Sequence, residues 1–369
     1  MSSPRILIMA GGTGGHVFPA LAVAHELRAR GAEVSWLGTR AGIEAELVPQ
    51  AGIAIDYISI TGLRGKGALG WLLAPLRIVR ALWQAWAVLR RRRPQAVLGL
   101  GGFASGPGGL AAWLSGRPLL IHEQNAVAGL TNRLLSRVAQ TVMQAFPHTF
   151  ADGARVMTCG NPVRREIVAV TSPEQRYAAH QGALHLLVIG GSLGAMALNE
   201  TLPRAMARLP AAQRPVVRHQ SGRRHLAQAQ QIYREAGVEA EVVPFIDDMA
   251  AAYDWADLVL CRAGALTVSE LAAAGAPALL VPYPHAVDDH QTRNAAFLVD
   301  AGAALLLPQH ALNDEMLAAA LQRFCADTGA GREALRAMAQ AAHRLAQPAA
   351  ATTVAEACLA ATATMRKAA

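Results

Sequence analysis

The chain has 369 residues, of which 53% are hydrophobic and 16% are charged, and its formal net charge is +8. This length suits two domains better than one core, and the apolar content excludes an intrinsically disordered chain. Arginine supplies nearly all of the positive charge, since lysine occurs only at Lys66 and Lys367. Such a balance suits a protein that meets phosphate-rich ligands, nucleic acid or an anionic membrane surface.

The four cysteines are far apart and include no C-x-x-C pair, so the sequence predicts neither a zinc site nor a disulfide framework. Cys261 lies in an apolar run, which favours a buried thiol over a reactive one. The apolar stretch at the N-terminus is too short for a signal peptide, and no stretch approaches the roughly 18 apolar residues of a membrane span. We therefore expect a cytoplasmic protein that is soluble or bound to a membrane only at its surface.

Short apolar runs alternate with longer helical patterns along the chain. The first run, residues 5–10, reads as a buried strand, and a helix follows through residues 20–30. Further strands are predicted at residues 33–38, 96–101, 118–123, 141–146 and 155–160. This alternation is typical of a parallel sheet with helices on both faces.

The opening strand and glycine turn occur a second time in the other half of the chain. The run HLLVIGGSLGA repeats the design of RILIMAGGTGG, and aligning Gly11 with Gly190 places the two 179 residues apart, about half the chain. A third glycine run, VLGLGGFASGPGG, lies at residues 97–109. Two strand-glycine-helix openings half a chain apart predict two similar Rossmann-like domains, with ligands at the carboxyl ends of the strands in a central cleft.

The domain boundary is predicted near residues 160–167, because an Asn-Pro pair does not continue regular structure easily. The α/β fold class therefore divides into residues 1–162 and residues 163–342. An Ala-rich tail helix follows at residues 343–369, and the sequence alone does not show whether it crosses back to the first domain.

The run GGTGGH at residues 11–16 places glycines between a strand and a helix. Such glycines let backbone N–H groups approach a phosphate near a helix N-terminus. The run fails as a dinucleotide fingerprint, because Val17 stands where the third glycine belongs and the second strand ends without an acid to hold a ribose. A tight turn without a ligand is the alternative interpretation.

His16 ends this glycine run. A neutral histidine can accept a proton from an attacking hydroxyl, so His16 is a candidate general base. The alternative is a histidine at a helix terminus that is bonded to backbone.

Two polar runs lie where predicted strands end. In GGSLGA, Ser192 can donate its hydroxyl to a phosphate oxygen, or it can be the N-cap of the next helix. The quartet HEQN at residues 122–125 follows a strand, at an edge where ligands bind, although an isolated quartet of this kind is usually a satisfied loop.

Residues 256–284 form the most specific stretch, in which an apolar strand is followed by Arg262-Ala263-Gly264, a helix and a second strand. The helix N-terminus would face a pyrophosphate, and Glu270, one turn into the helix, can accept hydrogen bonds from both ribose hydroxyls. Thr267 and Glu270 also have the spacing of a capping box, which is the structural alternative.

Paired acids occur in FIDDMAAAYDWAD at residues 245–257 and in DDHQTRNA at residues 288–295. Asp247 and Asp248 precede an apolar helix and have the position of capping residues. No set of histidine, cysteine and carboxylate residues has a convincing metal spacing, so no metal site is predicted.

The segment of residues 64–93 predicts a basic amphipathic helix. One helical face carries Leu72, Leu76, Val79, Trp83 and Trp86. Basic residues surround that face, namely Arg64, Lys66, Arg77, Arg80 and the run Arg90–Arg93. Tryptophan on the apolar face suits an anionic membrane surface, and the alternative is a core-facing helix with a solvated basic end. Nucleic acid is not expected, because no binding motif is recognisable and aromatic residues make up only 5%.

Nine runs together resemble the MurG family, and they appear in that family's order. They are GGTGGHVFPALAVA, GLRGKG, GLGGFASGPGGLAAW, HEQNAVAGLTNR, GNPVR, GGSLGA, FIDDMAAAY, CRAGALTVSELAAAG and DDHQTRNA. The resemblance covers essentially the whole chain. It implies a GT-B glycosyltransferase fold, with a C-terminal helix that returns to the N-terminal domain.

The resemblance also implies an activity and a setting. The reaction is the inverting transfer of N-acetylglucosamine from UDP-N-acetylglucosamine to the muramyl C4 hydroxyl of lipid I, an undecaprenyl-linked muramyl-pentapeptide, to give lipid II. This hexosyltransferase step belongs to peptidoglycan synthesis, and so to cell-wall biogenesis, cell shape and cell division. No cofactor or metal is expected, and the location implied is the cytoplasmic face of the inner membrane, as a peripheral protein that also contacts other cell-wall synthesis proteins.

The resemblance assigns roles to particular residues of this sequence. His16 and Asn125 would lie by the reacting centre, and Arg164 near the domain hinge and the nucleotide. The residues that would face the acceptor diphosphate and the donor are Thr13, Gly14 and Gly15. The residues that would bind the donor are Ser192, Ile246, Ala265, Leu266, Thr267, Val268, Ser269, Glu270 and Gln291. Leu193 stands where members of the family commonly have glutamine, so one polar donor contact is in doubt.

Two other functions fit parts of the sequence. A UDP-N-acetylglucosamine 2-epimerase would share the fold but would leave the basic amphipathic segment unexplained. A non-catalytic nucleotide-sugar-binding partner of wall-synthesis proteins would bind the donor without turnover.

Overall fold

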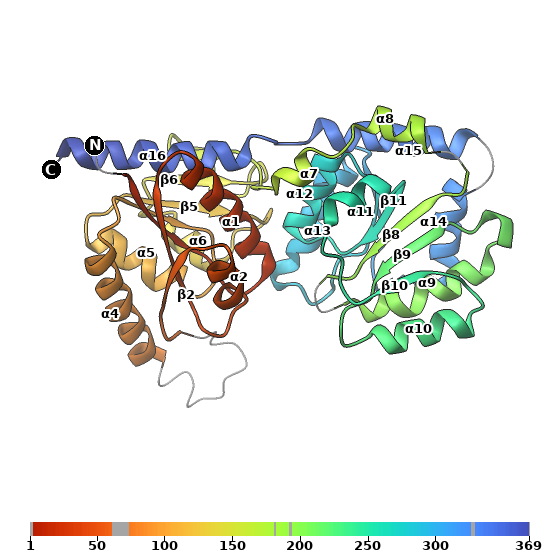
Figure 1. The fold of residues 1–369 in the computed structure, drawn as a ribbon, viewed down its shortest axis with the longest axis horizontal. Helices are drawn as coiled ribbons and strands as arrows, with labels where there is room; N and C mark the ends of the chain where they lie inside the picture. Colours follow the sequence, from red (N-terminus) through yellow and green to blue (C-terminus); the bar gives the residue numbers. More distant parts are fainter. Residues whose placement is uncertain (1–2, 61–73, 181, 192–193, 326–328, 369) are drawn as a thin grey trace. The chain divides into compact units, whose positions relative to one another are not determined.

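The computed structural model describes residues 3–60, 74–180, 182–191, 194–325 and 329–368, and Figure 1 shows its elements in sequence colours. The chain divides into two compact units. The first unit combines Met1–Arg164 with Pro348–Ala369, and the second is Arg165–Gln347. Each unit contains one parallel sheet with helices packed on it.

The sheet of the first unit has seven strands in the order β3-β2-β1-β4-β5-β6-β7, and its neighbours pair in parallel. The strands are β1 (Arg5–Met9), β2 (Glu33–Gly38), β3 (Ala54–Tyr57), β4 (Ala96–Gly99), β5 (Leu119–Glu123), β6 (Thr141–Gln144) and β7 (Val156–Thr158). The helices are α1 (Gly14–Ala29), α2 (Glu44–Gln50), α4 (Ala74–Arg92), α5 (Ser105–Leu114), α6 (Leu130–Leu135) and α16 (Ala350–Ala368).

Alternate side chains of β1 enter two different cores, because successive residues of a strand point to opposite faces of the sheet. Ile6 and Ile8 pack in the cluster that contains α1 and α16. Leu7 and Met9 pack in the cluster that contains α4 and α5. The strand is thus covered on both faces, which explains why its sequence is a continuous apolar run.

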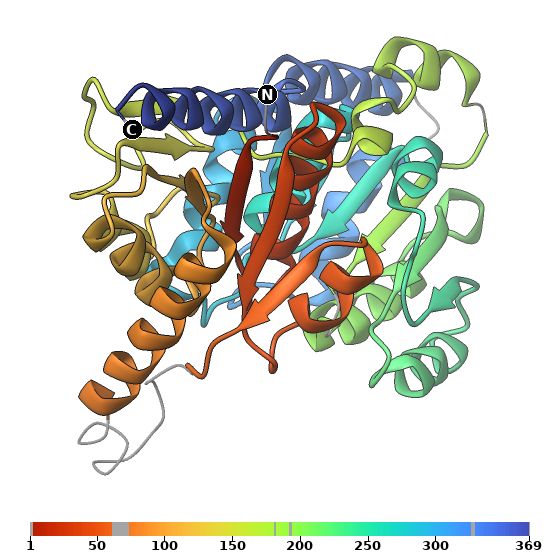
Figure 2. The same cartoon turned by 60° about the vertical axis from the view of Figure 1, so that its left-hand side comes forward.

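The last helix, α16, belongs to the first unit and packs along α1 (Figures 1 and 2). Its buried side chains Val354 and Cys358 share a core with α1, and Arg30 of the α1 C-cap forms an ion pair with Glu356 at 3.0 Å. The predicted tail helix began at residue 343, whereas α15 runs to Arg344 and the returning segment starts at Pro348. Proline has no N–H to donate and disfavours a helical residue before it, so the chain cannot continue one helix through this point.

The sheet of the second unit has six strands in the order β10-β9-β8-β11-β12-β13, again pairing in parallel. The strands are β8 (His185–Ile189), β9 (Val216–Gln220), β10 (Glu241–Val243), β11 (Leu258–Cys261), β12 (Ala278–Leu280) and β13 (Ala304–Leu306). The α-helices are α7 (Arg165–Val168), α8 (Pro173–Ala179), α9 (Met196–Arg208), α10 (Leu226–Glu235), α11 (Met249–Trp255), α12 (Ala265–Ala274), α13 (His290–Val299), α14 (Asp314–Cys325) and α15 (Gly329–Arg344). Two 3₁₀ turns cover Ala211–Gln213 and Val287–Asp289.

The strand order confirms the prediction of two Rossmann-like sheets. In each sheet the order reverses beside the first strand, between β1 and β4 and between β8 and β11. Ligands of such sheets bind outside the carboxyl ends of the strands at this switch point. The predicted glycine turns at residues 11–16, 97–109 and 190–195 all follow strands that flank a switch point. Among the described residues, no helix is long and apolar enough to span a membrane.

Candidate functional site

The first glycine turn leads from β1 into α1. Gly12 has a φ of 93°, and Thr13 is the extended N-cap residue of α1, so the helix begins at Gly14. The N–H groups of a first helical turn have no acceptor inside the helix and lie at the positive end of its dipole. The predicted residues Thr13, Gly14 and Gly15 are therefore at the place where an α-helix can attract an anion.

Glu44, which sequence reasoning missed, holds the base of this turn. Its carboxylate is fully buried and accepts hydrogen bonds from the N–H of Gly12 at 2.9 Å, and from the N–H and hydroxyl of Thr39 at 2.9 and 2.8 Å. A Cβ at Gly42 would lie only 2.0 Å from this carboxylate, so the glycine makes room for it. The N–H of Gly12 is thus used within the protein. The sequence showed that β2 ends without an acid. It did not show that Glu44, five residues after Thr39, folds back to contact the end of that strand.

His16 lies in the first turn of α1 and is half-buried. Its Nδ1 is 2.7 Å from Oε1 of Gln124, so its ring contacts a side chain, and the interpretation as a backbone-bonded helix terminus is wrong. Gly101 from the third glycine run has a φ of 101°, and a Cβ there would lie 2.9 Å from Cε1 and Nδ1 of the His16 ring. The glycine turn after β4 therefore allows the close approach that seats this imidazole.

The quartet at residues 122–125 ends β5 beside His16. His122, Glu123 and Gln124 are buried, and burial lowers the pKa of His122. Glu123 shapes the following loop, because one carboxylate oxygen accepts from the backbone and side-chain nitrogens of Asn125, at 3.0 and 3.2 Å, and the other from the N–H of Gly129 at 3.1 Å. Much of this quartet is thus a satisfied loop, and Asn125 is held half-buried at the edge of the same strand.

Arg164 is the last residue of the first unit, and its guanidinium lies over the ring of Phe18 with 5.6 Å to the ring centroid. Phe18 belongs to the second turn of α1, two residues after His16. The structure therefore brings Arg164 to the helix that carries the candidate base.

The second glycine turn follows β8. Gly190 and Gly191 are described, whereas Ser192 and Leu193 lie outside the described residues. The donor contact predicted for Ser192 and the effect of Leu193 therefore stay predictions. The N-cap of α9 is Ala195. Gln220, at the end of β9, donates to the carbonyl of Gly191 at 3.0 Å and accepts from the N–H of Ile246 at 3.0 Å. One buried amide therefore joins the glycine turn to Ile246, which is predicted to bind the donor.

Glu270 lies in α12, which follows β11 at the switch point of the second sheet. It is 6% exposed, and its Oε2 accepts a hydrogen bond from the hydroxyl of Tyr253 at 3.2 Å. The helix starts after Gly264, so Thr267 is its third residue and the capping-box interpretation is wrong. Tyr253, which sequence reasoning missed, positions this carboxylate from the neighbouring helix α11.

The rest of the predicted run follows the helical pattern. Val268 is fully buried, Ala265 is buried, and Leu266, Thr267 and Ser269 are half-buried. The Ser269 hydroxyl donates to the carbonyl of Ala265 at 3.1 Å. The first turn of α12 thus presents its backbone, rather than most of its side chains, at the carboxyl edge of the sheet.

Two further polar predictions are placed by the structure. Asp248 is the N-cap of α11, and its carboxylate accepts from the N–H of Ala251 at 2.9 Å, which confirms the capping role. Gln291 lies in the first turn of α13, and its Oε1 accepts from the N–H of Tyr283 at 2.9 Å. The amide nitrogen of Gln291 is therefore the end of this side chain that can donate.

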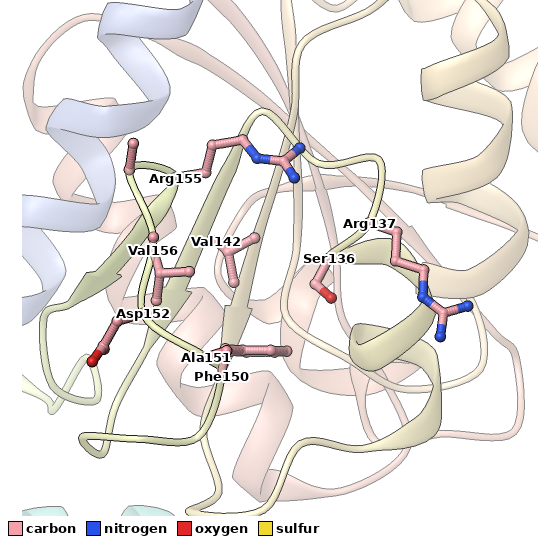
Figure 3. A pocket seen from close by; sticks show the side chains of 10 residues that line it. Ser136, Arg137, Val142, Phe150, Ala151, Asp152, Arg155 and Val156 are labelled. Carbon is pink, nitrogen blue, oxygen red and sulfur yellow. The ribbon is translucent and has the colours of Figure 1, made fainter.

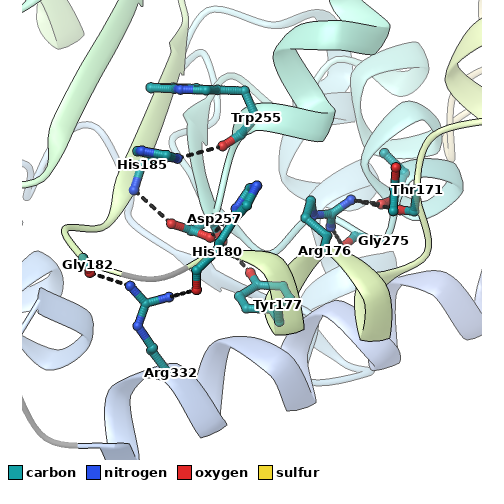
Figure 4. A network of polar contacts seen from close by, with 11 residues as sticks. Thr171, Arg176, Tyr177, His180, Gly182, His185, Trp255, Asp257, Gly275 and Arg332 are labelled. Carbon is teal, nitrogen blue, oxygen red and sulfur yellow. Dashed lines mark hydrogen bonds and ion pairs between the residues drawn. The ribbon is translucent and has the colours of Figure 1, made fainter.

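A polar network elsewhere in the second unit contains a group with metal-ligating side chains (Figure 4). Ligand atoms of His180, His185 and Asp257 lie within 4.8 Å of one another. Asp257 is buried, and its two oxygens contact Nδ1 of His180 and the N–H of His185, each at 2.9 Å. His185 begins β8 and Asp257 precedes β11, so the network lies at the amino ends of the strands, opposite the edge that carries Glu270. Its contacts tie α8 to the sheet.

A cavity of about 380 Å³ lies in the first unit, between β6, β7 and the loop before β7 (Figure 3). Its lining includes Val142, Phe150, Val156, Arg137 and Arg155. Val142 and Val156 stand at the amino ends of their strands, so the cavity is on the opposite edge of the sheet from His122. No predicted site residue lines it.

The cysteines are not reactive groups of these sites. Cys159, Cys261 and Cys358 are buried, and burial raises the pKa of each thiol to about 12. The thiols therefore stay protonated near neutral pH. The prediction that Cys261 is a core residue is confirmed.

The apolar face predicted for the basic helix is directed to solvent. Within α4, Leu76, Val79, Trp83 and Trp86 are all exposed. The helix is held by a different face, which carries Ala74, Ala81, Ala85, Val88 and Leu89. The alternative of a core-facing helix with a solvated basic end is thus confirmed for this second face, whereas the predicted apolar face does not face the core. Arg64, Lys66 and Leu72 lie outside the described residues.

Other exposed or charged groups lie on α4 and on the helix beside it. Helix α5 packs beside α4 (Figure 1). Its side chains Leu110, Trp113 and Leu114 are also exposed. Of the predicted arginine run, Arg91 and Arg92 form ion pairs with Asp56 at 2.5 and 2.6 Å, which partly neutralises their charge. The guanidinium of Arg90 lies over the Trp86 ring, 5.9 Å from its centroid. The apolar surface therefore combines tryptophans with a nearby cation.

Comparisons with known proteins match both halves of the chain. The glycosyltransferase family 28 N-terminal domain matches residues 6–144, and the glycosyltransferase family 28 C-terminal domain matches residues 185–356. The chain is 59% identical over 356 residues to the UDP-N-acetylglucosamine–N-acetylmuramyl-(pentapeptide) pyrophosphoryl-undecaprenol N-acetylglucosamine transferase of Alkalilimnicola ehrlichii, covering 96% of this chain and 98% of the relative. It is 60% identical over 355 residues to the transferase of the same name from Nitrosococcus oceani, with the same coverage.

A solved structure is similar over the same length. The crystal structure of Acinetobacter baumannii MurG matches with a TM-score of 0.82 and 43% identity, covering 96% of this chain and 99% of that one. The likeness therefore extends through both units and includes the segments that carry His16 and Glu270.

Proposed function

Because this chain belongs to the MurG family within glycosyltransferase family 28, we propose that it transfers N-acetylglucosamine from UDP-N-acetylglucosamine to the muramyl C4 hydroxyl of lipid I, with inversion, to form lipid II. The observation that carries this proposal is identity of 59–60% over 96% of the chain to transferases named for this reaction. The 2-epimerase and the non-catalytic partner are not favoured, since these relatives carry the transferase name.

The first unit supplies the acceptor side of the proposed reaction. Inversion needs a base at the attacking hydroxyl, and His16 is a half-buried imidazole at the carboxyl edge of the sheet. The first turn of α1, with Thr13, Gly14 and Gly15, attracts the acceptor diphosphate through its dipole. Asn125 follows β5 at the same edge and contributes a polar group near the reacting centre.

The second unit supplies the donor side. Glu270 accepts hydrogen bonds from the ribose hydroxyls, with its carboxylate oriented by Tyr253. The first turn of α12 stabilises the negative charge that develops on the departing UDP, which is the role of preorganised N–H dipoles in such reactions. Ile246 meets the uracil from a backbone position fixed by Gln220, and Gln291 donates its amide N–H to the sugar. This arrangement needs no metal ion.

The exposed face of α4 and α5 suits a location at an anionic membrane surface. A soluble protein rarely exposes several tryptophan and leucine side chains together, and such groups with nearby arginines favour the lipid interface. Trp83 is 78% exposed and Leu76 is 68% exposed on one helix. We therefore place the first unit against the cytoplasmic face of the inner membrane, where a lipid-linked acceptor lies.

The test is UDP release from UDP-N-acetylglucosamine with and without a lipid I analogue, followed by mass analysis of the product. Acceptor-dependent UDP release together with a product heavier by one N-acetylhexosamine is expected. Release without acceptor, or conversion of the donor to its epimer, would support the epimerase instead. Donor binding without release at any acceptor concentration would support the non-catalytic partner.

A further inference from the structure

We infer that Gln124 and His122 are positioning residues that hold the His16 imidazole in the tautomer with its proton on Nδ1, so that Nε2 is the atom that takes the acceptor proton. This inference rests on the proposed transferase function, in which His16 is the general base. It gives a positioning role to two buried side chains that do not touch substrate.

The first fixed point is the backbone carbonyl of Gly160. This oxygen only accepts hydrogen bonds, and Nε2 of His122 lies 2.9 Å from it. Nε2 of His122 therefore carries the proton. His122 is fully buried, and desolvation lowers its pKa, so the ring is neutral and its Nδ1 is an acceptor.

The second fixed point is the backbone carbonyl of His122. Nε2 of Gln124 lies 3.0 Å from that oxygen and 2.9 Å from Nδ1 of the same histidine. Both partners are acceptors, so the amide nitrogen of Gln124 must be at this end and its oxygen at the other. Gln124 is 1% exposed, and turning its amide over would place the side-chain oxygen against these two acceptors.

The direction of these hydrogen bonds then determines which nitrogen of His16 carries the proton. Oε1 of Gln124 is an acceptor 2.7 Å from Nδ1 of His16, so Nδ1 is the donor. A neutral imidazole carries one proton, so Nε2 of His16 bears the lone pair. The carbonyl of Gly160 thus sets the tautomer of His16 through two side chains.

The proton balance of the transfer follows from this arrangement. As the acceptor oxygen bonds to the sugar carbon, its proton passes to Nε2 of His16, and UDP leaves with the electron pair of the broken bond. The imidazolium of His16 keeps its proton on Nδ1 and donates it in a hydrogen bond to Oε1 of Gln124. The dipole of the Gln124 amide stabilises the positive charge of the imidazolium. An amide cannot take a second proton, so His16 returns its proton to solvent from Nε2 after the transfer.

The inference is tested by nitrogen NMR of the full chain labelled with ¹⁵N-histidine, using His16→Gln to assign the His16 signals. Two-bond correlations distinguish the two tautomers of a neutral ring. Wild type is expected to show His16 protonated on Nδ1, and protonation on Nε2 would overturn the inference. This readout does not need activity. If Nδ1 carries the proton but the lipid-dependent reaction is absent, the result contradicts the proposed function and leaves the tautomer inference intact.

Two substitutions separate positioning from folding. Gln124→Leu removes the acceptor, so mixed His16 tautomers and a kcat lowered by about 10- to 100-fold are expected, with KM for the donor little changed. Gln124→Glu keeps an acceptor oxygen toward His16 but loses the N–H that faces the two acceptors of His122, so it should keep the Nδ1 proton of His16 in the NMR spectrum without restoring the wild-type rate. Gln50→Leu, an exposed position of the same unit, is the control and should match wild type. Equal kcat values for wild type and Gln124→Leu would overturn the inference, as would mixed His16 tautomers in Gln124→Glu.

Discussion

Substituting Trp83 on the exposed face of α4 is expected to release the protein from membranes without unfolding it. Trp83 is 78% exposed, so its side chain has few protein contacts to lose. A tryptophan offers about 250 Å² of surface, and burying the exposed part at about 25 cal/mol/Å² would stabilise the bound state by about 5 kcal/mol. An interfacial ring buries about half of this, which gives about 2.5 kcal/mol, or a roughly 60-fold change in partitioning.

The assay is cosedimentation of wild type and Trp83→Ser with vesicles of neutral lipid and of neutral lipid mixed with anionic lipid. The substituted protein should partition more weakly into both, keep its thermal unfolding midpoint, and keep its activity on a soluble acceptor. The anionic vesicles should bind wild type more tightly, and added salt should reduce that advantage, because Arg80 and Arg90 are exposed near the face.

A matched pair of valines controls for a general effect of surface hydrophobicity. Val79 on α4 is 56% exposed, and Val216 on β9 of the second unit is 49% exposed. Val79→Ser should weaken vesicle binding by about fourfold, from about 0.8 kcal/mol of lost burial, whereas Val216→Ser should not weaken it. Equal losses for the two valines, or unchanged binding of Trp83→Ser, would refute the membrane assignment of this face.

Four further outcomes are expected. Glu270→Gln removes the charge from the proposed ribose contacts, so KM for UDP-N-acetylglucosamine should rise about 10- to 100-fold, and an unchanged KM would return this residue to a structural role. Gly101→Ala places a Cβ 2.9 Å from the His16 ring and should lower kcat. The control is Gly116→Ala, which is also at positive φ but has no atom within 4 Å of the added Cβ, so it should lower stability alone. Equal kcat values for these two variants would contradict the role of Gly101 in seating the His16 ring. Burial lowers the pKa of His219 to about 3, so between about pH 6.5 and pH 3 the unfolded chain binds a proton that the folded chain does not, and stability falls as pH falls. Between pH 7.5 and 5.5 this histidine should cost about 1.4 kcal/mol, and chemical denaturation of His219→Phe should show a pH dependence smaller by that amount. Chelator should leave the transfer rate unchanged, and loss of activity that added metal restores would contradict the metal-free proposal.

The sequence predicted the central strands because they are covered on both faces. Residues 5–10, 185–189 and 258–261 read as continuous apolar runs, and each is a strand beside a switch point. The strands that were not predicted include β3, β10 and β13, which are the outer strands of their sheets or have only three or four residues. An outer strand is partly exposed and short, so its apolar pattern is weak.

The sequence pointed to side chains whose setting is local, and it did not reveal which distant residues contact them. His16 and Glu270 stand beside a glycine turn and a helix start, which are visible in a few consecutive letters. Gln124 reaches His16 across 108 positions, and Glu44 reaches Gly12 across 32. Only the parallel order of the strands brings such pairs together. The direction of the α4 apolar face was equally undecided, because periodicity shows that a stripe exists and not what covers it.

The two glycine turns share a design but use it differently, and the difference lies in the side chain that secures each turn. Glu44 takes the N–H of Gly12, so this N–H is used within the protein, and the turn leads into the helix that carries His16. Gln220 instead donates to the carbonyl of Gly191 and accepts from the N–H of Ile246, which joins the second turn to the segment of Ile246. An acceptor-only carboxylate secures a turn through its N–H groups, whereas an amide can bridge a carbonyl and an N–H. The repeated glycines therefore specify the strand-to-helix geometry, and the securing side chain determines which neighbouring segment each turn is joined to.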